Sequence, residues 1–145
     1  LYSSILHLCL GEPSKARKSM KKILGSDKSF HTLPSYKTAR LVNLLIQAEL
    51  GNYDFFANEI SSIKRTISYE KQMYITEKLL FRFLMAHPLP IYRKDREKLW
   101  AQYQKDITRI RQDKYEKQLL KTFDFTAWIE SKLTNIPFRE ILYSE

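Results

Sequence analysis

The sequence contains few residues that interrupt regular structure or cross-link a chain. Its 145 residues include 3 glycines and 5 prolines, too few to supply the many turns of a β-sandwich. The single cysteine, Cys9, excludes an internal disulfide and fits a reducing compartment, so we expect a cytoplasmic protein. The best apolar run, LLFRFLMA over 79–86, is too short to span a bilayer and contains Arg82, so no membrane contact is predicted. Long helices with short connections are therefore predicted.

The residue patterns of several common catalytic sites are also missing. There is no glycine-rich phosphate loop, and no serine or cysteine stands in the context of a nucleophile. The three histidines (His7, His31 and His87) lack the spacing of metal ligands, and one cysteine cannot complete a zinc site. The sequence thus predicts no enzyme, no metal and no cofactor. The chain starts at Leu1 without Met, inside an apolar pattern, and we expect it to be a fragment of a longer protein.

Apolar residues at helical spacing are what the sequence does contain. Hydrophobic residues make up 43% of the chain and aromatic residues 13%, which is enough for a core. Their periodicity predicts about seven helices and no strand. Gly11 is placed to end the first helix and Pro13 to open the second, whereas HPLP at 87–90 stops a later one. A long helix is predicted from about 114 to 133, with Asp124 capping a restart within it.

Two segments of this helical pattern repeat at a fixed interval. Leu10-Gly11 corresponds to Leu50-Gly51, an offset of 40 residues (51 − 11). The apolar residues that follow each glycine by 5, 9 and 12 positions correspond as well: Ala16, Met20 and Ile23 in the first segment, and Phe56, Ile60 and Ile63 in the second. Each glycine is therefore predicted to form the turn of a helical hairpin, one hairpin at about 1–25 and the other at about 36–68.

The two hairpins resemble tetratricopeptide repeats, which are helix–turn–helix units of about 34 residues stacked into a solenoid. The A-x3-F spacing of that repeat appears here as Ala16-x3-Met20 and, in altered form, as Phe56-x3-Ile60. Its W-x2-L-G-x2-Y signature is not met in the first helix, where Ser3, Ser4 and His7 stand at the positions that align with its Leu, Gly and Tyr. The resemblance covers about residues 1–67.

The rest of the chain, with LLFRFL at 79–84 and YEKQLLKTFDFTAWIESKL at 115–133, resembles the C-terminal part of uncharacterised repeat proteins from Bacteroidetes-type bacteria. The resemblance implies a single all-α domain over 1–145. Its fold would be a right-handed α-solenoid of stacked antiparallel hairpins, followed by C-terminal helices over about 70–143. It also implies a bacterial, intracellular scaffold that binds protein partners in the concave groove.

Tyr36, Arg40, Asn43 and Gln47 are the candidate partner-binding residues. They lie at i, i+4, i+7 and i+11 on the first helix of the second hairpin, the helix that would line the groove. We predict a protein or peptide partner there, with an electrostatic rim formed by Lys15, Lys18 and Lys22. The alternative is ordinary exposure of one polar helix face.

The formal net charge of +9 (25 − 16) leaves a second function open, the binding of nucleic acid through the basic helix KARKSMKK. That charge is otherwise a solvated outer face. Trp100, Tyr103 and Trp128 raise the further alternative of a peptide-anchoring pocket, although aromatic residues at helical spacing more often form a core. An exposed apolar first helix would favour a homodimer.

Arg82 and His87 form an R-x4-H pattern that resembles the catalytic pair of HEPN-type ribonucleases, in which the histidine acts as general acid or base. Phe83 stands where that family usually has a polar residue, and Pro88 follows the histidine at once. The alternative is an arginine that snorkels from a buried helix and a histidine that caps its end. A ribonuclease is therefore the less favoured third hypothesis.

Overall fold

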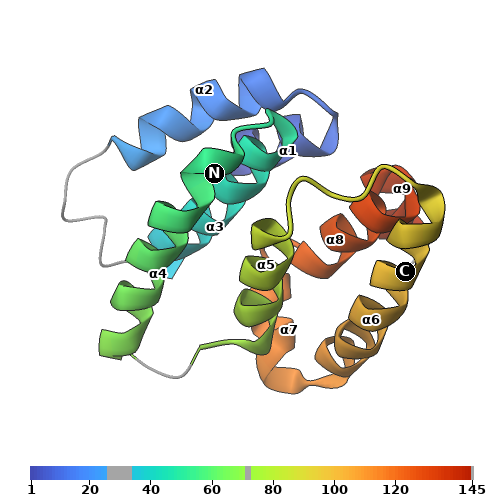
Figure 1. The fold of residues 1–145 in the computed structure, drawn as a ribbon. Helices are drawn as coiled ribbons and strands as arrows, with labels where there is room; N and C mark the ends of the chain where they lie inside the picture. The colour runs from blue at the N-terminus through green and yellow to red at the C-terminus, as the bar shows by residue number, and fades with distance from the viewer. Residues whose placement is uncertain (26–33, 71–72, 145) are drawn as a thin grey trace. The chain divides into compact units, whose positions relative to one another are not determined.

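The computed structural model describes residues 1–25, 34–70 and 73–144, and all regular structure in those ranges is helical (Figure 1). The all-α prediction is confirmed, although the described ranges hold nine α-helices rather than about seven. The chain divides into two compact units, Leu1–Glu70 (unit 1) and Lys71–Glu145 (unit 2). None of the described helices is long and apolar enough to cross a membrane. The single domain and the solenoid arrangement stay predictions.

Unit 1 consists of two helical hairpins, and α2 of the first packs against both α1 and α3. Pro13 occupies the first turn of α2, as its fixed φ and missing N–H favour. The second hairpin turns through a short 3₁₀ helix, η2, before its second α-helix begins. The elements are α1 (Tyr2–Cys9), α2 (Pro13–Leu24), α3 (Pro34–Glu49), η2 (Tyr53–Phe55) and α4 (Phe56–Glu70).

The turns at Gly11 and Gly51 have the same geometry. Both glycines are left-handed, with φ of 73° and 77°. The residue after each glycine donates its N–H to a carbonyl five positions earlier, Glu12 to His7 at 2.8 Å and Asn52 to Gln47 at 2.9 Å. This is the Schellman pattern, in which a residue without Cβ takes the left-handed position and the last helical carbonyls find donors. The predicted hairpin turn is therefore confirmed at both positions.

The core of unit 1 is built from the residues that recur after each glycine and from α3. Ala16 and Met20 are buried on α2, and their counterparts Phe56 and Ile60 are buried on α4. α3 contributes most of the rest because it is apolar nearly all round, as expected of a helix covered on several sides. Its fully buried residues are Ala39, Leu41, Val42, Leu44, Leu45 and Ile46.

Unit 2 is organised around α8, which contacts α5, α6 and α9. The ring of Trp128 lies at the centre of this core, 1% exposed and edge-on to Phe83 at 5.7 Å between centroids. Tyr103 packs edge-on against the same phenylalanine at 5.6 Å. The helices are α5 (Ile75–Met85), α6 (Arg93–Gln112), α7 (Lys114–Leu120), α8 (Phe125–Thr134) and α9 (Phe138–Ser144).

Aspartate caps mark where two helices of unit 2, α7 and α8, begin. The Asp113 carboxylate accepts the N–H of Tyr115 at 2.8 Å and so starts α7. The Asp124 carboxylate accepts the N–H of Ala127 at 3.0 Å and starts α8. Each cap satisfies a backbone donor that has no partner within its helix. The restart at Asp124 is therefore confirmed, and the long helix predicted over 114–133 is two helices.

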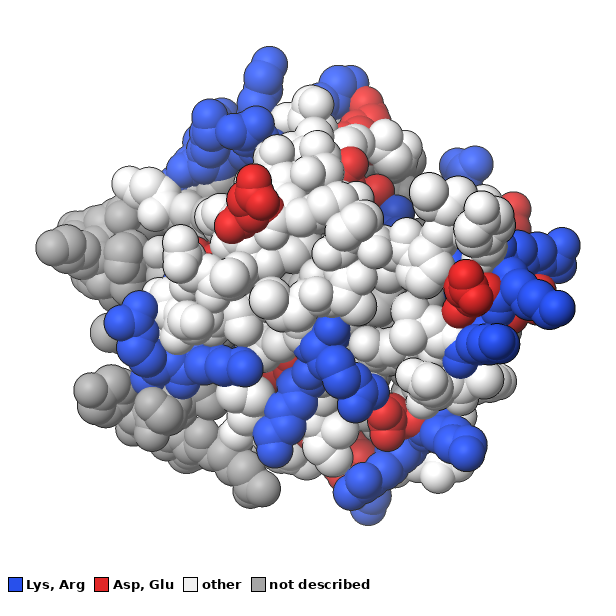
Figure 2. Space-filling view, viewed as in Figure 1, with Lys and Arg blue, Asp and Glu red and all other residues white. Residues whose placement is uncertain are grey.

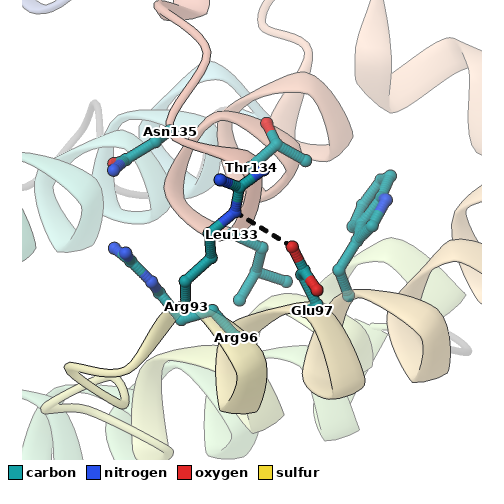
Figure 3. A pocket seen from close by; sticks show the side chains of 7 residues that line it. Arg93, Arg96, Glu97, Leu133, Thr134 and Asn135 are labelled. Atoms are coloured by element: carbon teal, nitrogen blue, oxygen red, sulfur yellow. Dashed lines mark hydrogen bonds and ion pairs between the residues drawn. The ribbon is translucent and has the colours of Figure 1, made fainter.

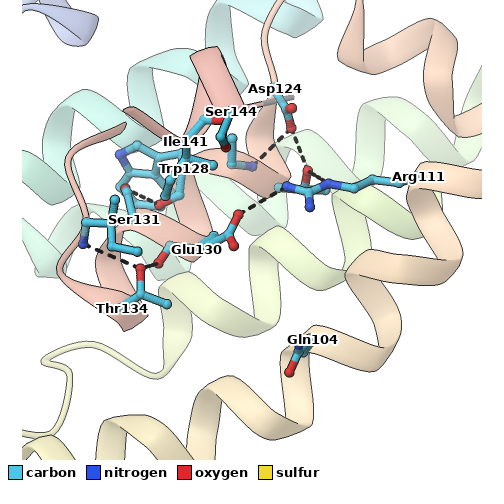
Figure 4. Close-up of polar contacts among 12 residues, drawn as sticks. Gln104, Arg111, Asp124, Trp128, Glu130, Ser131, Thr134, Ile141 and Ser144 are labelled. Carbon is cyan, nitrogen blue, oxygen red and sulfur yellow. Dashed lines mark hydrogen bonds and ion pairs between the residues drawn. The ribbon is translucent and has the colours of Figure 1, made fainter. Parts of the chain in front are cut away.

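Polar contacts also join helices of unit 2 that are distant in the sequence. Arg111 of α6 donates to Thr126 and Glu130 of α8, each at 3.3 Å (Figure 4). The buried carboxylate of Glu116 on α7 accepts both the N–H and the hydroxyl of Thr76, at 2.7 and 2.9 Å. Because Thr76 lies in the first turn of α5, Glu116 caps that helix from another element, where a negative charge also suits the helix dipole.

Candidate binding surfaces

The outer face of α1 is an exposed apolar stripe. Tyr2, Leu6 and Leu10 are 85%, 57% and 54% exposed, and their spacing of four residues places them on one side of the helix. Ser4 and Leu8 occupy the opposite side and are buried. The apolar positions over 2–10 predict a helix that is nearly buried, and this is wrong for its outer side, because α2 covers only one side of α1. Contiguous apolar surface of this kind marks interaction sites more often than scattered single residues do.

The apolar stripe on α1 also lacks charge. α1 contains no Lys, Arg, Asp or Glu, and its one basic group, His7, has Nδ1 3.5 Å from the Glu12 carboxylate. Cys9 is partly buried beside the stripe, and burial raises the pKa of its thiol. On a chain of net charge +9, this helix therefore offers a surface that another protein can approach without like-charge repulsion.

The outer face of α2 is basic. Arg17, Lys18, Lys21 and Lys22 are exposed and form no ion pair within the part of the chain that the structure describes. Lys and Arg side chains gather where Figure 1 draws α2, at the upper left of the view (Figure 2). Lys15 differs, because its Nζ lies 2.6 Å from a Glu12 carboxylate oxygen, a contact that lowers the pKa of that carboxyl. Of the predicted rim, Lys18 and Lys22 thus carry free charge and Lys15 does not.

The predicted stripe on α3 is engaged within its own hairpin. The Arg40 guanidinium donates to the Glu59 carboxylate and to the Ser62 hydroxyl of α4, each at 2.8 Å. Asn43 is only 7% exposed. Gln47 accepts a hydrogen bond from the Asn52 side chain at 2.7 Å, and Tyr36 is half-buried. Helical spacing placed the four residues on one face, but α4 and the turn, rather than open solvent, adjoin much of that face.

Arg82 and His87 have separate partners. The Arg82 guanidinium donates to Asp106 at 2.9 Å and lies over the Tyr103 ring, contacts that raise its pKa. His87 Nδ1 lies 3.0 Å from the Phe83 carbonyl oxygen, at the end of α5. No hydrogen bond joins the arginine to the histidine in the ranges described. The geometry supports the interpretation of a capping histidine, and the ribonuclease stays a prediction.

The remaining candidates divide between core and surface. Tyr103 and Trp128 are buried, as the core interpretation predicts, whereas Trp100 is half-exposed. His31 lies outside the described residues. Over 1–25, 34–70 and 73–144, no group of three or more His, Cys, Asp or Glu residues is arranged to hold a metal ion. Sequence reasoning did not name Tyr2, Leu6 and Leu10 as binding residues, although it linked an exposed apolar first helix to a homodimer.

Comparison with known proteins gives no family, since no family model, curated protein or solved structure matches the chain. The surfaces themselves therefore carry the functional argument.

Proposed function

We propose that this chain is a non-catalytic, cytoplasmic protein-interaction module that binds an amphipathic helix of a partner protein along α1. The observation that carries the proposal is the exposed, uncharged stripe of Tyr2, Leu6 and Leu10. Burying a leucine or an aromatic side chain contributes about 1.5–3 kcal/mol, so three such residues supply a useful part of a binding free energy. The tetratricopeptide resemblance supports the same kind of role.

The dimensions of the stripe suit a helix. From Tyr2 to Leu10 the helix rises about 12 Å, the length over which a partner helix presents two turns of its own apolar stripe. α2 already covers the opposite side of α1 in this way, as one helix packed along another. A second helix on the exposed side would repeat that packing.

The basic face of α2 specifies the charge of the partner. Arg17, Lys18, Lys21 and Lys22 extend along the helix that packs beside α1. Because α2 packs on the side of α1 opposite the stripe, these charges do not line it. Together with the net charge of +9 they attract an acidic partner at longer range, which speeds association and disfavours basic partners. The proposed partner therefore has an apolar stripe flanked by Asp or Glu. The proposal assigns binding to α1 and α2 in place of Tyr36, Arg40, Asn43 and Gln47.

The test uses a fluorescein-labelled peptide of three heptads, with leucine at the a and d positions and glutamate at the flanking ones. Fluorescence anisotropy should show saturable binding to the wild-type chain. Leu6→Glu should weaken it at least about tenfold, because a charge then faces the apolar stripe of the peptide. Ile91→Glu is the matched control, since Ile91 is 88% exposed and lies in unit 2. It should leave the affinity unchanged.

Two results would contradict the proposal. Equal binding to the wild type and to Leu6→Glu would remove the stripe from the interface. The second contradicting result would come from sedimentation velocity of the protein alone. If the wild type is a dimer and Leu6→Glu is a monomer, the stripe binds a second copy of the chain instead of a partner helix.

The free charges on α2 favour a second candidate, the binding of single-stranded RNA. If phosphates contact Lys18 and Lys22, affinity should fall steeply between about 50 and 200 mM salt. The double variant Lys18→Glu, Lys22→Glu should abolish RNA binding, whereas Leu6→Glu should retain it. RNA cleavage that disappears in His87→Ala would support the ribonuclease hypothesis instead.

A further inference from the structure

A pocket of about 440 Å³ lies in unit 2 between the start of α6 and the end of α8 (Figure 3). Its volume is within the range of about 300–1,000 Å³ that small-ligand sites occupy. α6 contributes Arg93, Arg96, Glu97 and Trp100, which are spaced to share one side of the helix. Leu133 and Asn135 approach from the end of α8.

The backbone at the end of α8 places the asparagine at this pocket. Asn135 is left-handed, with φ of 62°, and its N–H donates to the Ser131 carbonyl at 3.1 Å, which closes the helix. Asparagine is one of the few residues with a side chain that adopts this conformation readily. The turn leaves an exposed carboxamide, with both donors and an acceptor, at the edge of the pocket.

The charges in the pocket leave one cation in excess. Arg93 donates to the Glu97 carboxylate at 3.0 Å, and both side chains are largely exposed, so water weakens this pair. Arg96 is partly buried and forms no hydrogen bond or ion pair within the described ranges. Two arginines and one glutamate give a formal charge of +1 (2 − 1). The pocket is therefore matched to a single negative charge.

The pocket also has apolar lining, from Trp100 and Leu133, beside the polar Thr134. Trp100 is half-buried, and Leu133 is buried in the core of unit 2. An indole face adds contact area for a planar or bulky apolar group, and a guanidinium supplies two parallel N–H donors for a carboxylate. A ligand of this pocket would therefore combine a carboxylate, bound by the guanidinium, with an apolar group that packs on the indole.

We propose that this pocket binds a carboxylate attached to an aromatic or large apolar group, with Arg96 as the bidentate donor and Trp100 as the apolar wall. A phosphate monoester fits less well, because its charge of about −1.5 to −2 exceeds the single excess cation and Glu97 would repel it. Two sources have the required chemistry: the C-terminal residue of a peptide and a free aromatic carboxylic acid. The proposal is independent of the surface on α1.

Trp100 reports binding directly. The chain has two tryptophans, and Trp128 is 1% exposed, so a ligand in the pocket should change the emission of Trp100 over a constant background. The probes are N-acetyl-phenylalanine, its amide N-acetyl-phenylalaninamide, and a pentapeptide that ends in phenylalanine with a free carboxylate. Saturable changes are expected with the acid and the peptide, and none with the amide. Tighter binding of the peptide assigns the site to a peptide C-terminus; equal affinity assigns it to the free acid.

Variants of α6 test the role of the arginine. Arg96→Ala should raise the Kd at least about tenfold, the effect of losing a charge-assisted hydrogen bond of about 1.4 kcal/mol. Arg96→Lys keeps the charge but loses the two parallel N–H donors, and it should give an intermediate Kd. Arg109→Ala is the matched control, because Arg109 is an exposed arginine of the same helix outside the pocket. Circular dichroism of each variant verifies that the helices are retained.

Three results would overturn the proposal. Binding of the amide as tightly as the acid would show that the carboxylate is not recognised. An equal loss of affinity in Arg96→Ala and Arg109→Ala would show that general charge attraction, not the pocket, holds the probe. The absence of a saturable change with both carboxylates would show that the pocket does not take this class of ligand.

Discussion

The first helices of the two hairpins in unit 1, α1 and α3, end in the same turn but differ in what covers them. α3 is flanked by α2 and by α4, and Leu41, Leu44 and Leu45 are fully buried. α1 has α2 on one side only, and Leu6 and Leu10 remain more than half exposed. The comparison shows that a repeated turn and a repeated apolar spacing determine a hairpin, whereas its neighbours determine how much of it is buried.

The largest difference between the two helices should appear when a leucine is truncated. Leu45→Ala on α3 should lower the free energy of unfolding by about 2–5 kcal/mol, because it leaves a cavity in a closed core. Leu6→Ala on α1 should change it by less than about 0.5 kcal/mol, as is usual for exposed positions. Urea unfolding measures both values. Similar losses for the two variants would show that the faces of α1 and α3 are equally buried in solution.

The second-largest difference in stability is expected for the polar contacts that join the two helices of each hairpin. α3 and α4 are joined by Arg40, Glu59 and Ser62, whereas α1 and α2 are joined by a hydroxyl pair, Ser3 and Ser19, at 3.2 Å. Arg40→Ala should destabilise by about 1–2 kcal/mol, because it leaves a partly buried carboxylate without its donor.

Ser3→Ala is the matched change in the first hairpin and should stay within about 0.5 kcal/mol, since its bond is exposed to water. The midpoint of thermal unfolding reports both effects. A larger shift for Ser3→Ala than for Arg40→Ala would contradict the assignment of Arg40 to the interior of the hairpin.

The two turns, in contrast, should respond alike. A Cβ added at Gly11 or Gly51 would meet no atom within 4 Å, so the cost of alanine lies in the left-handed backbone alone. Gly11→Ala and Gly51→Ala should each destabilise by about 1 kcal/mol, and asparagine at either position by less. Guanidinium unfolding of the four variants checks this. Unequal effects of the two alanines would show that the turns are not equivalent.

The smallest expected effect comes from a charged residue that follows the first glycine but not the second. Glu12 follows the first glycine, and its hydrogen bond with Lys15 lowers the pKa of the carboxyl; the corresponding residue of the second turn, Asn52, does not titrate. Because the folded pKa is lower than the unfolded one, the stabilisation is present above the unfolded pKa and is lost as pH falls through the folded value. Lys15→Ala should raise the Glu12 pKa in an NMR titration, and an unchanged pKa would exclude that contact in solution.

The sequence predicted the features that depend on neighbouring residues. Gly11 and Gly51 form the predicted turns, Pro13 opens α2, and Asp124 caps α8. Each of these follows from the backbone preference or the hydrogen-bonding group of one residue beside a helix end. The same local logic could not show that α7 and α8 are separate helices, although the cap between them was recognised.

The features that depend on distant residues were not predictable in this way. Helical spacing placed Arg40 and Asn43 on one face of a helix, but only the fold shows that α4 lies against that face. The pocket combines Arg96 with Asn135, which are 39 positions apart (135 − 96), and neither stands in a recognisable motif. Periodicity identifies which residues share a face of a helix, but the element that packs against that face is determined by the fold of the whole chain.

The cap that Glu116 provides for α5 has a consequence for the order in which unit 2 is completed. Thr76 donates to a carboxylate 40 positions later in the chain, so a ribosome releases α5 well before its cap has been made. At about 5–20 residues per second, the delay is about 2–8 s. During that interval the apolar face of α5 lacks both its core and its terminal partner. A nascent chain arrested before residue 116 should therefore keep this segment exposed to proteases and to chaperones.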